Sequence, residues 1–211
     1  IPGGVSYHAP MAYDVGDALG DIFSVDANQD GFSDLMVYDQ NAVMPGVHLL
    51  EGDGLGAFTL SDFFPIGNGA QGFRAQDINA DGAVDLIVSN TLGGGVEIAL
   101  GNVDSGFVYS AGSSVLHAPG TLPYALVLSD LNADQKLDLV ISEASPGNES
   151  LQVFLASENA TAGTSYEEAA SFPLPAFSLH ISNADLDQNG LDEIYVLSSS
   201  TQDSGMRVFC Q

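Results

Sequence analysis

Basic residues are scarce in this chain of 211 residues, in which three lysines and arginines stand against 28 aspartates and glutamates. The formal net charge of −25 would repel phosphate backbones and anionic membrane surfaces, so we expect no nucleic-acid partner. Such a charge also destabilises a compact chain by self-repulsion unless cations bind to it, and each bound Ca²⁺ cancels two negative charges. The composition therefore favours a fold that includes metal ions.

Cysteine, tryptophan and long apolar runs are also missing or nearly so. Cys210 is the single cysteine, so no internal disulfide can form, and we interpret it as a buried thiol or as a residue that pairs between chains. No apolar run approaches the roughly 18 residues needed to cross a bilayer, and we expect no membrane insertion. The absence of tryptophan weakens any case for sugar recognition by aromatic stacking.

A repeat of about fifty residues is the strongest signal in the sequence. One acidic pattern begins at Asp26, Asp77, Asp130 and Asp185, at intervals of 51, 53 and 55 residues. Four such periods account for nearly the whole chain, so we interpret residues 1–211 as a single domain.

Each copy of the repeat reads as a set of short strands. Apolar and β-branched runs flank the acidic pattern on both sides, a third run follows, and in the first three copies a glycine-rich or polar turn leads to a fourth. The predicted fourth runs span 58–66, 107–116 and 166–174. Four short strands per period are typical of one blade of a β-propeller, and we predict an all-β propeller of four four-stranded blades.

The ends of the chain suggest how such a ring could close. The last copy stops after its third strand, whereas residues 5–15 have strand character and no blade of their own. We expect this N-terminal strand to complete the last blade and close the ring, which would remove exposed sheet edges. A fragment of a larger ring, or half of a ring assembled from two chains, would show the same pattern.

The acidic loops at 26–34, 77–85, 130–138 and 185–193 have the composition of calcium sites. Oxygen-bearing side chains fall at positions 1, 3, 5 and 9 of each loop, and the backbone carbonyl of position 7 is the expected fifth ligand; Ca²⁺ prefers such hard oxygen ligands, and no loop contains His or Cys. We therefore predict up to four Ca²⁺ ions. The predicted ligands are Asp26, Asn28, Asp30, Phe32 and Asp34; Asp77, Asn79, Asp81, Ala83 and Asp85; Asp130, Asn132, Asp134, Lys136 and Asp138; and Asp185, Asp187, Asn189, Leu191 and Glu193.

Position 6 distinguishes the third loop from the others. Glycine occupies this position in the other three loops, as expected where the chain turns with a positive φ, but the third loop has Gln135. Lys136 adds a positive charge beside it, so we predict the third site to be the weakest. Position 12 is apolar in every loop, which excludes an EF-hand because that motif needs a bidentate glutamate there.

The four segments DANQDGFSDLMV, DINADGAVDLIV, DLNADQKLDLV and DLDQNGLDEIYV resemble the FG-GAP or VCBS repeats of integrin α-chain propellers, of certain fungal lectins and of many secreted bacterial proteins. The resemblance covers the whole chain. It implies a propeller in which each loop joins the first two strands of a blade and calcium fastens that hairpin. It also implies a protein that is secreted or lies at the cell surface.

Three functions agree with these observations. The first is a binding module for a glycan or protein ligand, similar to a lectin or an adhesion domain, and this is the one we favour. The second is a structural or assembly unit, including a homo-oligomer that forms a larger propeller. The third is the propeller part of a polysaccharide-active enzyme, which the sequence disfavours because His8, His48, His117 and His180 lie singly and no catalytic cluster is visible.

Overall fold

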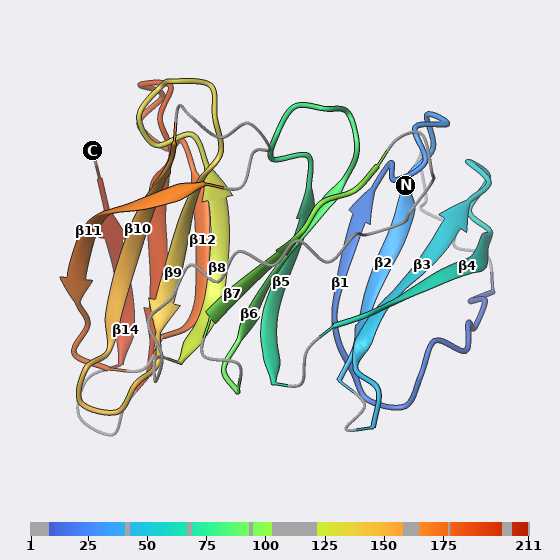
Figure 1. Cartoon of the computed structure of the whole chain (residues 1–211), viewed down its shortest axis with the longest axis horizontal. Helices are drawn as coiled ribbons and strands as arrows, with labels where there is room; N and C mark the ends of the chain where they lie inside the picture. Colours follow the sequence, from blue (N-terminus) through green and yellow to red (C-terminus); the bar gives the residue numbers. More distant parts are fainter. Residues whose placement is uncertain are drawn as a thin grey trace, which may run out of the picture.

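The computed structural model of the chain describes residues 9–40, 43–66, 69–92, 95–102, 122–157, 165–176, 178–199 and 204–210. Within these ranges all regular structure is antiparallel β-sheet, with fourteen strands in four sheets (Figure 1). These same residues form no helix, and so none that is long and apolar enough to cross a membrane. The predicted all-β class is confirmed.

Each sheet corresponds to one copy of the repeat, and we call the sheets blades 1 to 4. Within each blade the strands follow one another in sequence order. Blade 1 contains β1 (Leu19–Val25), β2 (Asp34–Asp39), β3 (Gly46–Gly52) and β4 (Phe58–Pro65). Blade 2 contains β5 (Ala70–Gln76), β6 (Asp85–Asn90) and β7 (Gly95–Ala99). Blade 3 contains β8 (Pro123–Ser129), β9 (Asp138–Glu143), β10 (Ser150–Ala156) and β11 (Tyr166–Pro173). Blade 4 contains β12 (Ser178–Ala184), β13 (Glu193–Ser198) and β14 (Gly205–Phe209).

The predicted strands agree closely with those in the structure. The fourth strands expected at 58–66 and 166–174 are present as β4 and β11. The one expected at 107–116 lies outside the described residues. Cys210 is exposed rather than buried, because it follows the last strand at a free end of the sheet.

Consecutive blades pack face to face through apolar side chains. In blades 2 and 3 the second strand lies between neighbouring blades on both faces, and β6 is buried at every position. Phe73 of blade 2, for example, is fully buried against Phe23 and Tyr38 of blade 1, with ring centroids 4.7 and 5.9 Å apart. Similar clusters join blade 2 to blade 3 and blade 3 to blade 4. Such runs of residues buried on both faces explain the strongly apolar strands of the repeat.

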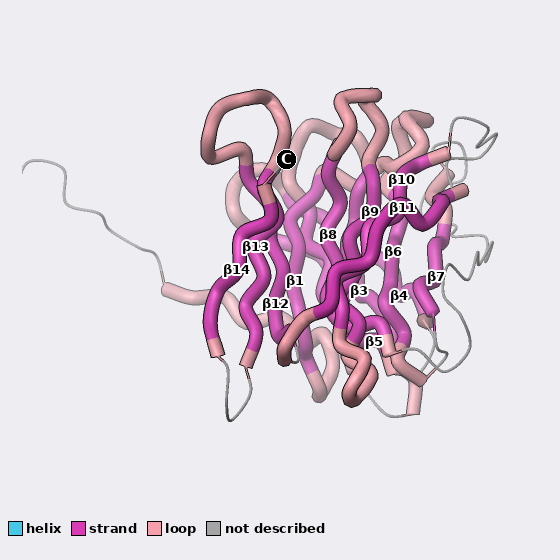
Figure 2. The backbone as a smooth tube through the Cα atoms, turned by 90° about the vertical axis from the view of Figure 1, so that its left-hand side faces the viewer, coloured by secondary structure: helices cyan, strands magenta, loops and turns pink. Residues whose placement is uncertain are grey.

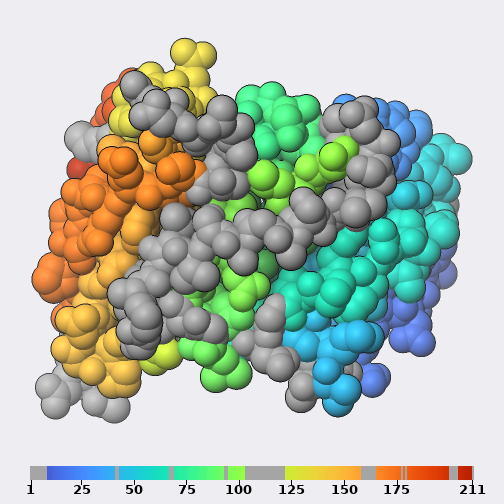
Figure 3. All heavy atoms as spheres, viewed as in Figure 1, coloured from blue at the N-terminus to red at the C-terminus, as the bar shows by residue number. Residues whose placement is uncertain are grey.

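The four blades form an open arc in the described part of the chain. The first strands of consecutive blades contact one another, β1 with β5, β5 with β8 and β8 with β12, whereas blades 1 and 4 lie at opposite ends of the row (Figures 1 and 3). No closed ring is present among the described residues, so the predicted closure is not confirmed.

The N-terminal segment also differs from its prediction. Residues 9–15 form no strand, and they lie on blade 1 rather than blade 4. Val15 packs on Val37 and Leu50, and the Tyr13 hydroxyl accepts a hydrogen bond of 3.1 Å from the Phe58 backbone N–H. Burial of Val15 on an apolar face stabilises the segment on blade 1. Residues 5–8 of the predicted strand lie outside the described residues.

Candidate metal centres

All four acidic loops lie along one edge of the arc. Each joins the first two strands of its blade, as the resemblance implied, and in Figure 1 the loops stand side by side along the upper edge. The first two loops are in direct contact, because the side chain of Gln29 donates a hydrogen bond to the backbone carbonyl of Gly82. The repeat therefore places four sets of carboxylates on a common edge.

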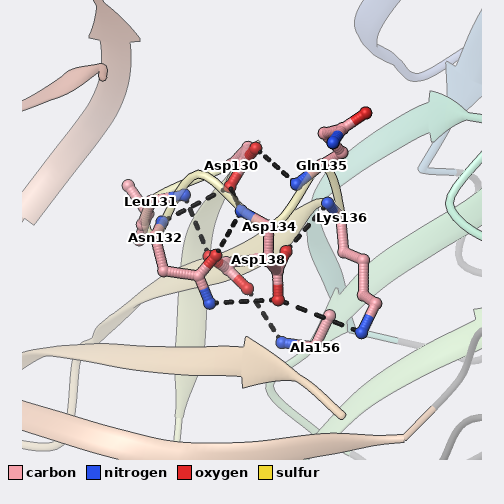
Figure 4. Close-up of polar contacts among 8 residues, drawn as sticks. All are labelled: Asp130, Leu131, Asn132, Asp134, Gln135, Lys136, Asp138 and Ala156. Atoms are coloured by element: carbon pink, nitrogen blue, oxygen red, sulfur yellow. Dashed lines mark hydrogen bonds and ion pairs between the residues drawn. The ribbon is translucent and has the colours of Figure 1, made fainter. Parts of the chain in front are cut away.

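The third loop shows the internal order of these sets (Figure 4). The backbone N–H of Asp134 donates to the side chains of Asp130, at 3.1 Å, and Asn132, at 2.9 Å. The N–H of Gln135 donates to the second oxygen of Asp130 at 2.8 Å, and the N–H of Lys136 donates to Asp134 at 2.9 Å. Backbone amides thus draw the side chains of positions 1, 3 and 5 toward the inside of one turn.

The other loops repeat this arrangement almost bond for bond. The N–H of position 6 donates to the position-1 carboxylate at 3.0 Å in the first loop, 2.8 Å in the second and 3.0 Å in the fourth. The N–H of each position-7 residue donates to the side chain of position 5. The structure therefore brings the side chains of positions 1, 3 and 5 together within each loop.

The acid at position 9 has a structural role that its spacing did not reveal. Asp34, Asp85 and Asp138 are fully buried, and Glu193 is nearly so. One carboxylate oxygen accepts a hydrogen bond from the N–H of position 2, at 2.8 to 3.0 Å across the four loops. In the first three loops the other oxygen accepts from a backbone N–H at or just beyond the end of the third strand, that of Gly52, Gly101 or Ala156, at 2.8 Å each time. Position 9 thus fastens each loop to its sheet.

The loop backbones adopt a left-handed conformation at two positions. Position 6 has a positive φ in every loop, with values of 87° at Gly31 and 68° at Gln135, as expected. Position 4 is also left-handed, although it never holds glycine: φ is 60° at Gln29, 57° at Ala80, 61° at Ala133 and 61° at Gln188. A non-glycine residue in this region costs about 1 kcal/mol, so each loop depends on its other contacts to hold this shape.

Burial among like charges perturbs the acids of these loops. The pKa of Asp85 is raised to about 6, chiefly by loss of solvent; two backbone hydrogen bonds oppose this rise, and the neighbouring carboxylates of Asp81 and Asp77 add to it. The pKa of Asp138 is raised in the same way, first by burial. An ionised acid at these positions is destabilising unless a cation lies beside it.

Two observations test whether a metal ion fits these loops. In the fourth loop, oxygens of Asp185, Asp187 and Glu193 lie within 4.8 Å of one another, which is close enough to hold a single ion. In the first loop, Oδ1 of Asp26 is buried and has no hydrogen-bond partner. A buried carboxylate oxygen without a donor is costly, and a cation is the partner that would satisfy it. The candidate donors in both loops are oxygen atoms, which is the ligand type that Ca²⁺ prefers.

The third loop differs from the others in the way that its sequence indicated. Lys136 Nζ lies 3.9 Å from Asp134 Oδ2, so a positive side chain already accompanies one of the candidate ligands. Between the second and third loops is a hollow of about 290 Å³, whose lining includes Asn79, Ala80, Gln135 and Lys136.

Comparison with known proteins agrees with this geometry. The architecture of repeated antiparallel sheets of three or four strands, with hairpin loops on one edge, is that of a β-propeller. The FG-GAP-like repeat matches residues 26–88 and 77–141, which together cover more than half of the chain. The chain belongs to this family.

A similar solved structure is that of BBS1N in complex with ARL6DN, soaked with lead. It is 12% identical to this chain, with a TM-score of 0.55, and the match covers 92% of this chain. The chain spans 57% of that structure's length, and the likeness shows the fold alone. No curated protein sequence matches the chain.

Proposed function

We propose that this chain is a calcium-stabilised interaction module, secreted or displayed at the cell surface, that binds a protein partner. The observation that carries the proposal is the set of four acidic loops held side by side on one edge, with Asp26 Oδ1 buried and unpaired in the first. Propeller repeats of this family are a scaffold for interaction surfaces, and nothing in the loops resembles a catalytic centre.

Calcium would be held by the side chains of positions 1, 3, 5 and 9 in each loop, together with the position-7 carbonyl. When bound, the ion supplies positive charge that offsets repulsion among clustered carboxylates. The chain itself contributes the preformed turn, in which backbone amides already orient the ligands. It also contributes the position-9 acid, whose hydrogen bond joins the loop to the end of the third strand. Calcium binding would therefore stiffen the edge of the arc.

A protein partner fits the surface better than a glycan does. Several aromatic residues that could stack on sugars take part in packing: Tyr13 meets the edge of Phe58, Phe63 lies against His48, and Phe64 is buried in the core. The hollow between the second and third loops, at about 290 Å³, is at the small end of the range of small-molecule pockets. BBS1N, the similar structure, is itself in complex with a protein.

The described histidines give no support to an enzyme. His48 lies partly buried on blade 1 beside Asp39, with Nε2 3.9 Å from Oδ2, and His180 is exposed on blade 4. These two side chains are on the first and last blades, so they do not form one acid–base pair.

Arrays of extracellular proteins and of glycans, probed with the labelled chain in calcium and in chelator, test this function. We expect binding to a protein that is lost in chelator and weakened by Asp77→Ala. Binding to glycans alone, or protein binding that is identical in chelator, would contradict the proposal.

A further inference from the structure

The acidic loops lie at one of the two edges between which the strands of the blades run (Figure 2). The first and second loops are packed together at their bases, where Ala27 and Val84 belong to one apolar cluster. The second and third loops meet in the same way, because Ile78 and Leu137 at the corresponding positions pack against the next cluster. The two junctions between these loops are therefore alike at the base.

The outer parts of the two junctions differ at position 4. The side-chain amide of Gln29, at position 4 of the first loop, donates a hydrogen bond to the backbone carbonyl of Gly82, at position 6 of the second. Position 4 of the second loop is Ala80, whose methyl group forms no such bond. Ala80 instead lines the hollow whose opposite wall includes Gln135, at position 6 of the third loop. The backbones are alike, with φ of 60° at Gln29 and 57° at Ala80, so the difference lies in the side chain.

The acceptor of this bond lies between predicted ligands of the second loop. The Gly82 carbonyl shares a peptide group with the N–H of Ala83, which donates to the Asp81 side chain at 2.8 Å. The carbonyl of Ala83 is the predicted backbone ligand, and the N–H of Gly82 donates to Asp77 at 2.8 Å. Hydrogen bonds in series polarise and strengthen one another. The bond from Gln29 therefore supports the arrangement of the second ligand set.

The donor lies between ligands in the same way. Gln29 stands between Asn28 and Asp30, the predicted ligands of positions 3 and 5. These two are joined by hydrogen bonds, from Asn28 Nδ2 to Asp30 Oδ2 at 3.0 Å and from the Asp30 N–H to Asn28 Oδ1 at 2.9 Å. Their convergence holds the backbone of Gln29 in its left-handed conformation. Both ends of the bond to Gly82 thus depend on the order of a ligand set.

We propose that the first and second loops bind calcium with positive cooperativity through the hydrogen bond from Gln29 to Gly82, and that the second and third loops lack this coupling. The inference rests on the proposed calcium sites and concerns their regulation. Without metal, repulsion among the clustered carboxylates opposes the ordered arrangement of each loop. An ion in one loop orders one partner of the bond, so the other loop loses less conformational freedom when it binds. The coupling should be about fivefold in affinity, which corresponds to one net hydrogen bond.

Repulsion between neighbouring ions acts in the opposite direction. An ion in one loop adds positive charge near the next and weakens binding there, and salt screens this effect. A variant that removes the bond without changing any charge separates the two effects, and Gln29→Ala is that variant. Alanine already occupies position 4 in the second and third loops at φ of 57° and 61°, so the variant should fold.

A calcium titration of the full chain, followed by NMR at the position-6 amides, measures each site separately. The Gly31 amide reports the first site and the Gly82 amide the second. Asp81→Ala disables the second site and should weaken calcium binding at Gly31 about fivefold. Asp134→Ala, the matched control, removes one carboxylate from the third loop and should leave the titration at Gly31 unchanged.

Ala80→Gln tests whether position 4 decides which loops are coupled. The new side chain should cross the hollow to the carbonyl of Gln135, as Gln29 reaches Gly82. Calcium binding at Gly82 should then become sensitive to Asp134→Ala, which it is not in the unmodified chain. Coupling between the second and third sites that is already present in the unmodified chain, or that stays absent in Ala80→Gln, would contradict this role of position 4.

The Gln29→Ala background gives the decisive comparison. There, Asp81→Ala should affect binding at Gly31 about fivefold less than in the unmodified chain, because the bond is already absent and the change in charge is the same in both backgrounds. An equal effect in both backgrounds would overturn the coupling while leaving the calcium sites in place. A chain that shows no calcium-dependent shift at Gly31 or Gly82 would overturn the sites themselves and the coupling with them.

Discussion

The side chain of Asp85 accepts a hydrogen bond of 2.8 Å from the backbone N–H of Gly101 and so joins the second acidic loop to the end of the third strand of blade 2. A second bond of 3.0 Å, from the N–H of Ile78, holds the same carboxylate to the start of the loop. One buried acid thus connects a candidate metal ligand set to the sheet, and the equivalent acids do so in blades 1 and 3. Gain or loss of the metal ion should therefore change the stability of the fold.

The raised pKa of Asp85, about 6 against an ordinary 3.8, predicts an unusual pH dependence in the absence of metal. Its contribution to stability is fully present below the ordinary value and is lost as the pH rises through about 6, because the buried acid must then ionise. In chelator we expect a higher melting temperature at about pH 5 than at about pH 7.5. In calcium the order should reverse, since protonated ligands bind metal weakly.

Asp85→Asn separates this effect from the general repulsion of a chain with charge −25. The variant should show a flatter melting profile with pH in chelator, because its side chain does not ionise. If the melting temperature of the variant changes with pH as steeply as that of the unmodified chain, Asp85 is not the source of the pH dependence.

Removal of a single ligand should remove a single ion. Asp81→Ala takes one carboxylate from the second loop, and we expect bound calcium to fall by about one ion and the stability in calcium by about 3 kcal/mol at saturating metal. Asp62→Ala is the control, because it removes the same charge from the exposed outer strand β4. Unchanged stoichiometry in Asp81→Ala, measured by metal analysis after dialysis, would contradict the ligand assignment.

Glycine at position 6 should stabilise the third loop. Gln135 has a φ of 68°, and Gln135→Gly should raise the free energy of unfolding by about 1 kcal/mol and strengthen calcium binding at this site. Gln29→Gly, also at a left-handed position, should gain less because it loses the hydrogen bond to Gly82. Denaturant titrations of both variants measure the difference, and a destabilised Gln135→Gly would contradict the strain argument.

The residues of the repeat predicted the local structure well, and the limits of that prediction are physical. Position 6 has a positive φ, and the glycines there allow this to be predicted from the sequence. Position 4 also has a positive φ, but its residues are glutamine and alanine, which do not indicate a left-handed conformation. The burial of Asp34 and its equivalents depends on a strand some eighteen residues away, so the spacing of the loop could not reveal it.

The sequence could not predict whether the ring closes, for a similar physical reason. Closure depends on the angles between blades and on where Val15 finds an apolar face, and these are set by contacts between distant segments. Alternation along β14 shows that Met206 and Val208 share one face, but only the structure shows that this face is uncovered.

A calcium titration followed by thermal melting tests the central claim most directly. The account predicts that the unmodified chain binds close to four ions and that its melting temperature rises steeply between chelator and saturating calcium, with the third site filled last. A chain that binds no calcium, or whose melting temperature is the same in chelator and in calcium, would contradict it.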